Sequence, residues 1–155
     1  MRTAGSGEDP ARLPVPVLAY VGDAVFELYA RTRALRELWG ARGEGQRAMA
    51  LPAPPVRRLH ARVVPLTRAS GQARLLELVW PRLTPDEQDV ARRARNRHLR
   101  RRPVGTGLGE YRNSTGFEAL VGFLYLSGRQ GRLEELLESA VAALEEGACA
   151  GHGPG

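Results

Sequence analysis

The chain has 155 residues, of which 43% are apolar and 26% charged, and its formal net charge is +6. This length suits one domain, and the composition is that of a globular protein rather than a disordered one. No apolar run approaches the ~20 residues of a membrane span, and the N-terminal segment lacks a signal-peptide core. The only cysteine, Cys149, excludes an intrachain disulfide, so we expect a cytoplasmic protein without a membrane partner.

The positive charge is concentrated in the middle of the chain. Residues 56–102 contain 13 arginines and 4 acidic residues, whereas residues 127–155 contain 2 arginines and 5 glutamates. All 23 basic residues are arginine. A bias toward arginine accounts for the missing lysine but not for the clustering. The distribution therefore indicates a polyanionic partner, most simply a nucleic acid.

Residues 1–13 and 147–155 are rich in glycine, proline and small residues, and we expect them to be disordered tails around one domain spanning 14–146. The first helix is predicted over about 16–38, with an apolar stripe centred near Val17, Val21 and Leu28. The LPAPP sequence at 51–55 breaks the pattern. A helical region follows over roughly 56–80, and Pro65 is expected to interrupt or kink it.

Thr84 begins the next helix with several agreeing signals. Thr84 can cap, Pro85 suits the first turn, and Glu87 completes a capping box. This helix carries the segment DVARRARNRHLRR and must end before Pro103. After a glycine-rich loop at 105–109, two more helices carry STGFEALVGFLYL and RLEELLESAVAALEE, separated by SGRQG. No stretch predicts a confident strand, so the expected fold class is all-α.

The stretch YVGDAVFELY combines an apolar helix with two unfavourable residues, Gly22 and Asp23. On a helical wheel Asp23 lies almost opposite the apolar stripe, which by itself favours a simple solvent-exposed carboxylate. A surface helix gains nothing from Gly22, however. The glycine favours close approach of another backbone or of a ligand at this point.

A second carboxylate, Glu118, has similar surroundings. Thr115 precedes it by one turn and Gly122 follows by one turn, so we expect a groove of small residues that leaves space beside the carboxylate. The spacing of Thr115 and Glu118 also fits a capping box, in which Glu118 only satisfies backbone donors. A helix beginning near Tyr111 would instead place Glu118 in its interior, free for chemistry.

Two helical carboxylates facing one cavity suit a hard divalent ion such as Mg²⁺, which prefers oxygen ligands and keeps several waters. Such an ion can activate water and stabilise charge on a phosphate. The three histidines are scattered, and the sequence has neither a zinc-type ligand set nor a Walker-type phosphate loop.

YVGDAVFELY and STGFEALVGFLYL together resemble the two motifs of the ribonuclease III catalytic domain, over roughly residues 15–145. The resemblance is strongest to the short Mini-III branch, which consists of that domain alone. Three further features carry it: Ala-Tyr precedes Val-Gly-Asp, Tyr111-Arg112 precedes Ser-Thr, and RARNR stands where that branch has an arginine-rich loop.

The resemblance implies a homodimer that cuts double-stranded RNA with Mg²⁺ and trims the paired ends of the 23S ribosomal RNA precursor, with a ribosomal protein as a possible helper. By position, Asp23 matches the catalytic aspartate and Glu118 the metal-binding glutamate, so both are expected at the metal. Ala19 and Thr115 stand where full-length ribonuclease III has further carboxylates. The Mini-III branch resembles this sequence in that reduction.

Since no separate RNA-binding domain follows the motifs, the catalytic domain is expected to hold RNA itself. Seven arginines and no acid occur in residues 91–103, enough to neutralise several phosphates. The expected RNA-binding residues are Arg92, Arg93, Arg95, Asn96, Arg97, Tyr111 and Arg112.

Two other interpretations remain open. One is a catalytically silent RNA-binding module of the same fold, which the two missing carboxylates favour. The other is a helical dimeric scaffold whose arginines reflect compositional bias. Metal-dependent cleavage of duplex RNA separates the nuclease from both.

Overall fold

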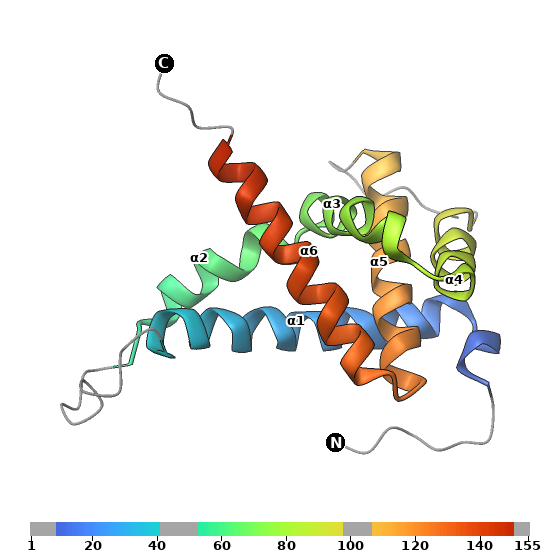
Figure 1. Ribbon diagram of the computed structural model, residues 1–155, viewed down its shortest axis with the longest axis horizontal. Coiled ribbons are helices and arrows are strands. Elements are labelled where there is room, and N and C mark those ends of the chain that lie inside the picture. Colours follow the sequence, from blue (N-terminus) through green and yellow to red (C-terminus); the bar gives the residue numbers. More distant parts are fainter. Residues whose placement is uncertain (1–8, 41–52, 98–106, 151–155) are drawn as a thin grey trace.

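The computed structural model describes residues 9–40, 53–97 and 107–150, and the regular structure in these residues is helical (Figure 1). This confirms the all-α prediction. No helix in these ranges is long and apolar enough to cross a membrane. In chain order the elements are η1 (Pro10–Arg12), α1 (Val15–Gly40), α2 (Val56–Thr67), α3 (Ala69–Val79), η3 (Trp80–Arg82), α4 (Pro85–Arg95), α5 (Leu108–Leu126) and α6 (Gln130–Ala150).

The helices are arranged around α5, which contacts α1, α3, α4 and α6. In Figure 1 the long helix α1 runs horizontally, α5 crosses its N-terminal half steeply, and α2 lies along its C-terminal half. Most of the side chains of α5 from Phe117 to Leu124 are buried. This helix is therefore the centre of the core, and anything on its surface near α1 is held from several sides.

The buried face of α1 differs from the predicted apolar stripe. Leu18 and Phe26 are fully buried, whereas Val17 and Leu28 of the predicted stripe are exposed. The stripe prediction is wrong for the single chain because α1 is apolar on two opposite faces, so its periodicity does not identify the inner one. The structure leaves a second apolar face of α1 on the surface.

The predicted interruption near Pro65 occurs three residues later. Pro65 lies within α2, and the chain leaves the helical conformation at Arg68, whose ψ is 156°. Helix α3 then starts in close contact with the end of α2. A Cβ atom on Gly71 would lie 2.1 Å from the carbonyl oxygen of Pro65, so only glycine permits this junction.

Helix α4 ends before Pro103, as predicted, and the first and last described elements extend beyond residues 14 and 146. Helix α4 ends at Arg95 and is followed by Asn96 as its C-cap, so it stops well before Pro103. The remaining arginines of the segment, at 100–102, lie outside the described residues. At the N-terminus, η1 begins before the expected domain boundary at residue 14, and α6 continues to Ala150, past the expected boundary at 146.

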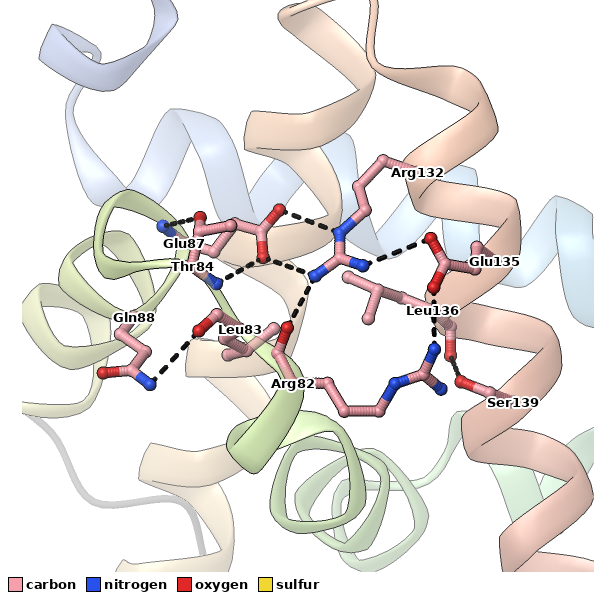
Figure 2. Close-up of polar contacts among 9 residues, drawn as sticks. All are labelled: Arg82, Leu83, Thr84, Glu87, Gln88, Arg132, Glu135, Leu136 and Ser139. Carbon is pink, nitrogen blue, oxygen red and sulfur yellow. Dashed lines mark hydrogen bonds and ion pairs between the residues drawn. The ribbon is translucent and has the colours of Figure 1, made fainter.

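The capping box at the start of α4 is present as predicted and also connects α4 to α6 (Figure 2). The Thr84 backbone N–H donates to Glu87 Oε2 at 2.9 Å. Arg132 from α6 donates to both oxygens of Glu87, at 3.2 and 3.1 Å, and to the carbonyl oxygen of Arg82 at 2.6 Å. Glu87 is only 1% exposed. Burial acts to raise the pKa of Glu87, but the hydrogen bonds from Arg132 and the Thr84 backbone outweigh it and lower that pKa.

Replacement of Arg132 by methionine is expected to destabilise the fold by about 2–4 kcal/mol, because it leaves the buried Glu87 carboxylate without its counter-charge. Urea unfolding monitored by circular dichroism measures this. The matched control is Arg74→Met, which removes an exposed i,i+3 pair with Glu77 and should cost less than about 1 kcal/mol. Equal effects of the two substitutions would contradict the proposed role of the buried pair.

Candidate active site

Helices α1 and α5 cross with their backbones in direct contact, and two glycines make this possible. A Cβ atom on Gly22 would lie 1.8 Å from the carbonyl oxygen of Glu118, and one on Gly122 would lie 2.0 Å from the carbonyl oxygen of Leu18. Neither position tolerates a side chain without displacing a helix. The close approach that Gly22 predicted is therefore made by the backbone of α5, the helix that carries Glu118.

The crossing brings Asp23 and Glu118 together. Gly22 touches the backbone of Glu118, and Asp23 is the next residue of α1. Asp23 is exposed and Glu118 is half-buried. Burial and then the negative charge of Asp23 raise the pKa of Glu118 to about 7, while the amide of Gln72 acts in the opposite direction. The two carboxylates thus share one partly desolvated site.

Glu118 lies in the interior of α5 and does not cap it. The helix begins at Leu108 with Gly107 as its N-cap, ten residues before Glu118. The Thr115 hydroxyl, which the capping-box interpretation requires at the N-cap, instead donates to the carbonyl oxygen of Tyr111 at 3.0 Å. The structural alternative for Glu118 is therefore excluded.

The predicted groove of small residues around Glu118 is only partly correct. The Gly122 side is filled by the backbone of α1 at Leu18. Behind the crossing, Phe26 of α1 and Phe117 of α5 pack edge-to-face with ring centroids 4.8 Å apart. These contacts fix the two helices against each other, which is what a site built from one carboxylate on each helix requires.

The donor set fits a hard divalent cation. Mg²⁺ is commonly bound through one or two carboxylates, with waters and substrate phosphates as the remaining ligands. Within the described ranges, no group of three or more His, Cys, Asp or Glu residues could hold a metal ion. Ala19 is buried, and the Thr115 hydroxyl is engaged within α5. A zinc-type cage is thus absent from these residues, and two carboxylates remain for an ion with open positions.

The predicted RNA-binding residues of the arginine-rich segment fall into two groups. Arg93 is exposed, but its guanidinium is engaged by the protein, since it donates to Asp89 at 3.0 Å and to the carbonyl oxygen of Ala11 at 2.9 Å. The Arg95 guanidinium lies 5.3 Å from the ring centroid of Trp80. Arg92, Asn96 and Arg97 are also exposed.

Tyr111 and Arg112 lie in the first turns of α5, where Tyr111 is half-buried and Arg112 is exposed. Seven residues separate Tyr111 from Glu118, which is about 10 Å along a helix. The role of these residues in binding RNA stays a prediction.

Sequence reasoning missed Gln72 in α3. This glutamine is 2% exposed, and it acts to lower the pKa of Glu118. The only signal in the sequence was one amide among small and apolar residues, ASGQARLL, which does not distinguish a buried polar group from a surface one.

Comparison with known proteins is consistent with this geometry. The family model described as "Ribonuclease III domain" matches residues 16–129. The chain is 40% identical over 139 residues to the Mini-ribonuclease 3 of Symbiobacterium thermophilum, covering 90% of this chain and 96% of that protein. It is 38% identical to that of Thermoanaerobacter sp. (84% and 82% covered) and 33% identical to that of Staphylococcus aureus (83% and 87%).

A crystal structure of a Fusobacterium nucleatum protein has the same fold, with a TM-score of 0.71 at 20% identity, covering 88% of this chain and 98% of that one. The family match includes both carboxylate-bearing helices, α1 and α5, up to residue 129. The chain therefore belongs to the ribonuclease III family, in its Mini-ribonuclease 3 branch, and is an endoribonuclease.

Proposed function

We propose that this protein cleaves double-stranded RNA with Mg²⁺ held by Asp23 and Glu118, and that its substrate is the paired end region of the 23S ribosomal RNA precursor. The observation that carries the proposal is the backbone contact at Gly22, which puts one carboxylate from α1 beside one from α5. Cleavage of labelled duplex RNA with and without Mg²⁺ tests it.

In this mechanism the protein positions the metal ion and provides the negative charge that binds it. Asp23 and Glu118 present carboxylate oxygens from two helices that cannot shift relative to each other, because their backbones are in contact. When bound, Mg²⁺ lowers the pKa of a coordinated water and stabilises the charge that develops on the phosphate. The exposed position of Asp23 leaves one side of the site accessible to an RNA backbone.

The raised pKa of Glu118 gives the site a pH dependence. Without metal, Glu118 is largely protonated below pH 7, and a protonated carboxyl is a poor ligand for Mg²⁺. Cation binding therefore releases a proton near neutral pH, so the affinity for Mg²⁺ falls as pH decreases through 7.

Exposed arginines outside the site are proposed to bind the RNA backbone. The double variant Arg92→Ala/Arg97→Ala should weaken duplex binding irrespective of sequence, because phosphate contacts carry no base information. The slope of log K against log salt should become shallower by roughly 1 for each lost phosphate contact. The turnover rate at saturating RNA should stay close to that of the parent.

Arg93→Ala is the matched control for this experiment. Since Arg93 bonds Asp89 and the backbone of Ala11, its loss should affect the attachment of η1 to α4 more than the salt slope. A double variant whose salt slope equals that of the parent would rule out phosphate contacts by Arg92 and Arg97.

The second apolar face of α1 is proposed to be covered by another copy of the chain. Tyr20 is 82% exposed and Leu28 is 57% exposed. Val17, Val21 and Ala24 share their helical face. Apolar side chains gathered on one face are typical of protein–protein contact, and a twofold partner presents the same face in return.

Sedimentation at micromolar concentration should therefore show a homodimer. Leu28→Arg should shift it to a monomer, because a charge buried in an apolar interface lacks a partner. Ala142→Arg adds the same charge at an exposed position of α6 and should leave the dimer intact. A parent protein that sediments as a monomer contradicts the proposal.

The alternative of a silent RNA-binding module, suggested by the lack of carboxylates at positions 19 and 115, does not agree with the membership of this chain in an endoribonuclease family. It predicts salt-dependent duplex binding without cleavage at any Mg²⁺ concentration. The comparison of parent and Asp23→Asn described in the Discussion distinguishes it from the nuclease.

A further inference from the structure

Arg95, the last residue of α4, is the only arginine of that helix whose side chain is partly buried. A Cβ atom on Gly116 would lie 2.9 Å from Arg95 Cγ, so the aliphatic part of the side chain lies against α5. The guanidinium carbon lies over the Trp80 ring, 5.3 Å from its centroid. Trp80 directly follows α3 and is itself half-buried. Residues from three parts of the fold therefore fix the position of one cation.

The contact with Trp80 holds the charge of Arg95 and leaves its hydrogen-bonding capacity available. An aromatic ring attracts a cation through its face but offers no lone pair to the five guanidinium N–H groups. Arg93, in the same helix, donates to a carboxylate and to a carbonyl oxygen. Arg95 has no such hydrogen bond or ion pair with any other residue in the described ranges. Its planar set of donors matches the oxygens of a phosphate group.

A second arginine lies on the same face of α5. Arg112 precedes Gly116 by four residues, and residues i and i+4 of a helix share a face. Arg112 is exposed. Because the Arg95 side chain contacts this face at Gly116, two cations from different helices lie within about one helical turn of each other along α5. Like charges at close range repel, so this arrangement favours a bound anion.

We propose that Trp80 is a positioning residue for RNA binding: its indole ring holds the Arg95 guanidinium near Arg112, where both cations contact the phosphate backbone of duplex RNA. The inference rests on the proposed function, because it requires duplex RNA as the ligand. A free arginine side chain loses rotamer freedom when it binds a phosphate, and a side chain already held against Trp80 and α5 loses less. Since phosphate contacts carry no base information, the gain in affinity is independent of sequence.

The fluorescence of Trp80 reports this contact directly. The chain has two tryptophans, Trp39 and Trp80, so Trp39→Phe leaves Trp80 as the only indole. Titration of this variant with duplex RNA in a buffer without divalent ions measures binding without cleavage. The Trp80 emission should change, with a midpoint equal to the Kd from filter binding, and addition of Arg95→Ala should remove most of the change. A Trp80 emission that does not respond to saturating RNA overturns the inference.

A double-mutant cycle separates positioning from folding. Arg95→Ala should raise the Kd for duplex RNA and make the slope of log K against log salt shallower by roughly 1. Trp80→Leu should raise the Kd roughly 3-fold to 10-fold, as expected for the loss of a cation–π contact. It should have no further effect when Arg95 is already alanine, since there is then no cation to hold. Trp80→Phe should retain most of the parent affinity, because its ring also attracts the guanidinium. If Trp80→Leu does not fold, the fluorescence titrations, which keep Trp80, decide.

Arg129→Ala is the matched control. The Arg129 guanidinium also lies over a ring, 5.2 Å from the centroid of Phe123. Its surroundings differ, since these two residues line a cavity together with three aspartates, Asp9, Asp86 and Asp89. Negative charge repels a phosphate, so the Kd and the salt slope of this variant should equal those of the parent. A loss of affinity equal to that of Arg95→Ala would mean that only the total charge of the protein matters, which overturns the inference.

The two proposals fail in different ways. A parent protein that neither binds nor cuts duplex RNA removes the proposed function and the role of Trp80 with it. A parent that binds and cuts, with folded Trp80→Leu and Arg95→Ala variants that match its Kd for RNA, removes only the role of Trp80. An effect of Trp80→Leu that is equally large with and without Arg95 does the same.

Discussion

Asp23→Asn is expected to abolish Mg²⁺-dependent cleavage of duplex RNA, with a loss on the order of 100-fold or more, while the fold and duplex binding are retained. The amide keeps the size of the side chain but removes the charge that attracts the ion. Even the outer partners of metal ligands cost about 10–100-fold when they are lost, so a direct ligand should cost at least as much. Because Asp23 is exposed, we expect the variant to fold as the parent does.

Glu118→Gln should also abolish cleavage at moderate Mg²⁺, with partial rescue at high Mg²⁺. If both carboxylates serve one ion, the double variant should be no worse than the more damaged single variant, because residues that act as a unit are not additive. Single-turnover cleavage rates of the parent, both singles and the double at a series of Mg²⁺ concentrations test this. Full activity in Asp23→Asn would sink the proposed mechanism.

Glu118→Gln carries a second expectation that separates function from folding. The pKa of Glu118 in the folded, metal-free protein is about 7, above the value in an unfolded chain. The metal-free fold therefore loses stability as pH rises through 7 and Glu118 ionises. Removing the carboxylate should stabilise the metal-free protein above pH 7, on the order of 1–3 kcal/mol after allowance for solvent screening. If Glu118→Gln melts at a lower temperature than the parent at pH 8, this contradicts the expectation that the ionised Glu118 carboxylate destabilises the metal-free fold.

Gly22→Ala is expected to produce the largest loss of stability among single substitutions in α1. The added Cβ would lie 1.8 Å from the carbonyl oxygen of Glu118 and 2.7 Å from the backbone nitrogen of Gly122. These are backbone atoms of a central helix and have no rotamer to change, so α1 must move away from α5. Overpacking of this kind costs about 1–3 kcal/mol and sometimes more, and we expect the upper end. Thermal unfolding measures the cost.

The same displacement should separate Asp23 from Glu118, so Gly22→Ala should reduce cleavage even in the fraction of protein that stays folded. Gly147→Ala is the control, because a Cβ on Gly147 in α6 would meet no atom within 4 Å. Alanine is the better helix former by up to about 1 kcal/mol, so the control should be neutral or slightly stabilised. A Gly22→Ala protein as stable as the parent would mean that the two helices do not cross in contact.

Much of this molecule could be predicted from local sequence. The start of α4 was determined by Thr84 and Glu87, because a capping box uses only residues within one turn. The end of α5 near Gly128 follows from a glycine with φ of +70°, a conformation that other residues rarely adopt. Asp23 and Glu118 were singled out by their place beside glycines in apolar helices and by the resemblance of their two motifs to those of the ribonuclease III family. The prediction that Gly22 marks a close approach was confirmed.

Other features depended on contacts between segments far apart in the chain. The inner face of α1 could not be chosen from its sequence, because the helix is apolar on two faces and only packing against α5 selects that of Leu18 and Phe26. Whether Glu118 caps a helix or lies in a helix interior depended on where α5 begins. Because the N-cap, Gly107, makes no side-chain capping bond, the sequence did not reveal that start.

The sequence by itself determined that the chain is helical and where α4 starts, since these depend on residues within a few turns of each other. It also singled out Asp23 and Glu118, whose role at a metal ion stays a prediction. The tertiary structure decided that Glu87 pairs with Arg132 of α6 and that Gln72 of α3 is buried. The contact between Glu87 and Arg132 joins polar groups that lie 45 residues apart in the chain. Burial gives such groups their importance, and burial is a property of the packed helices rather than of any single segment.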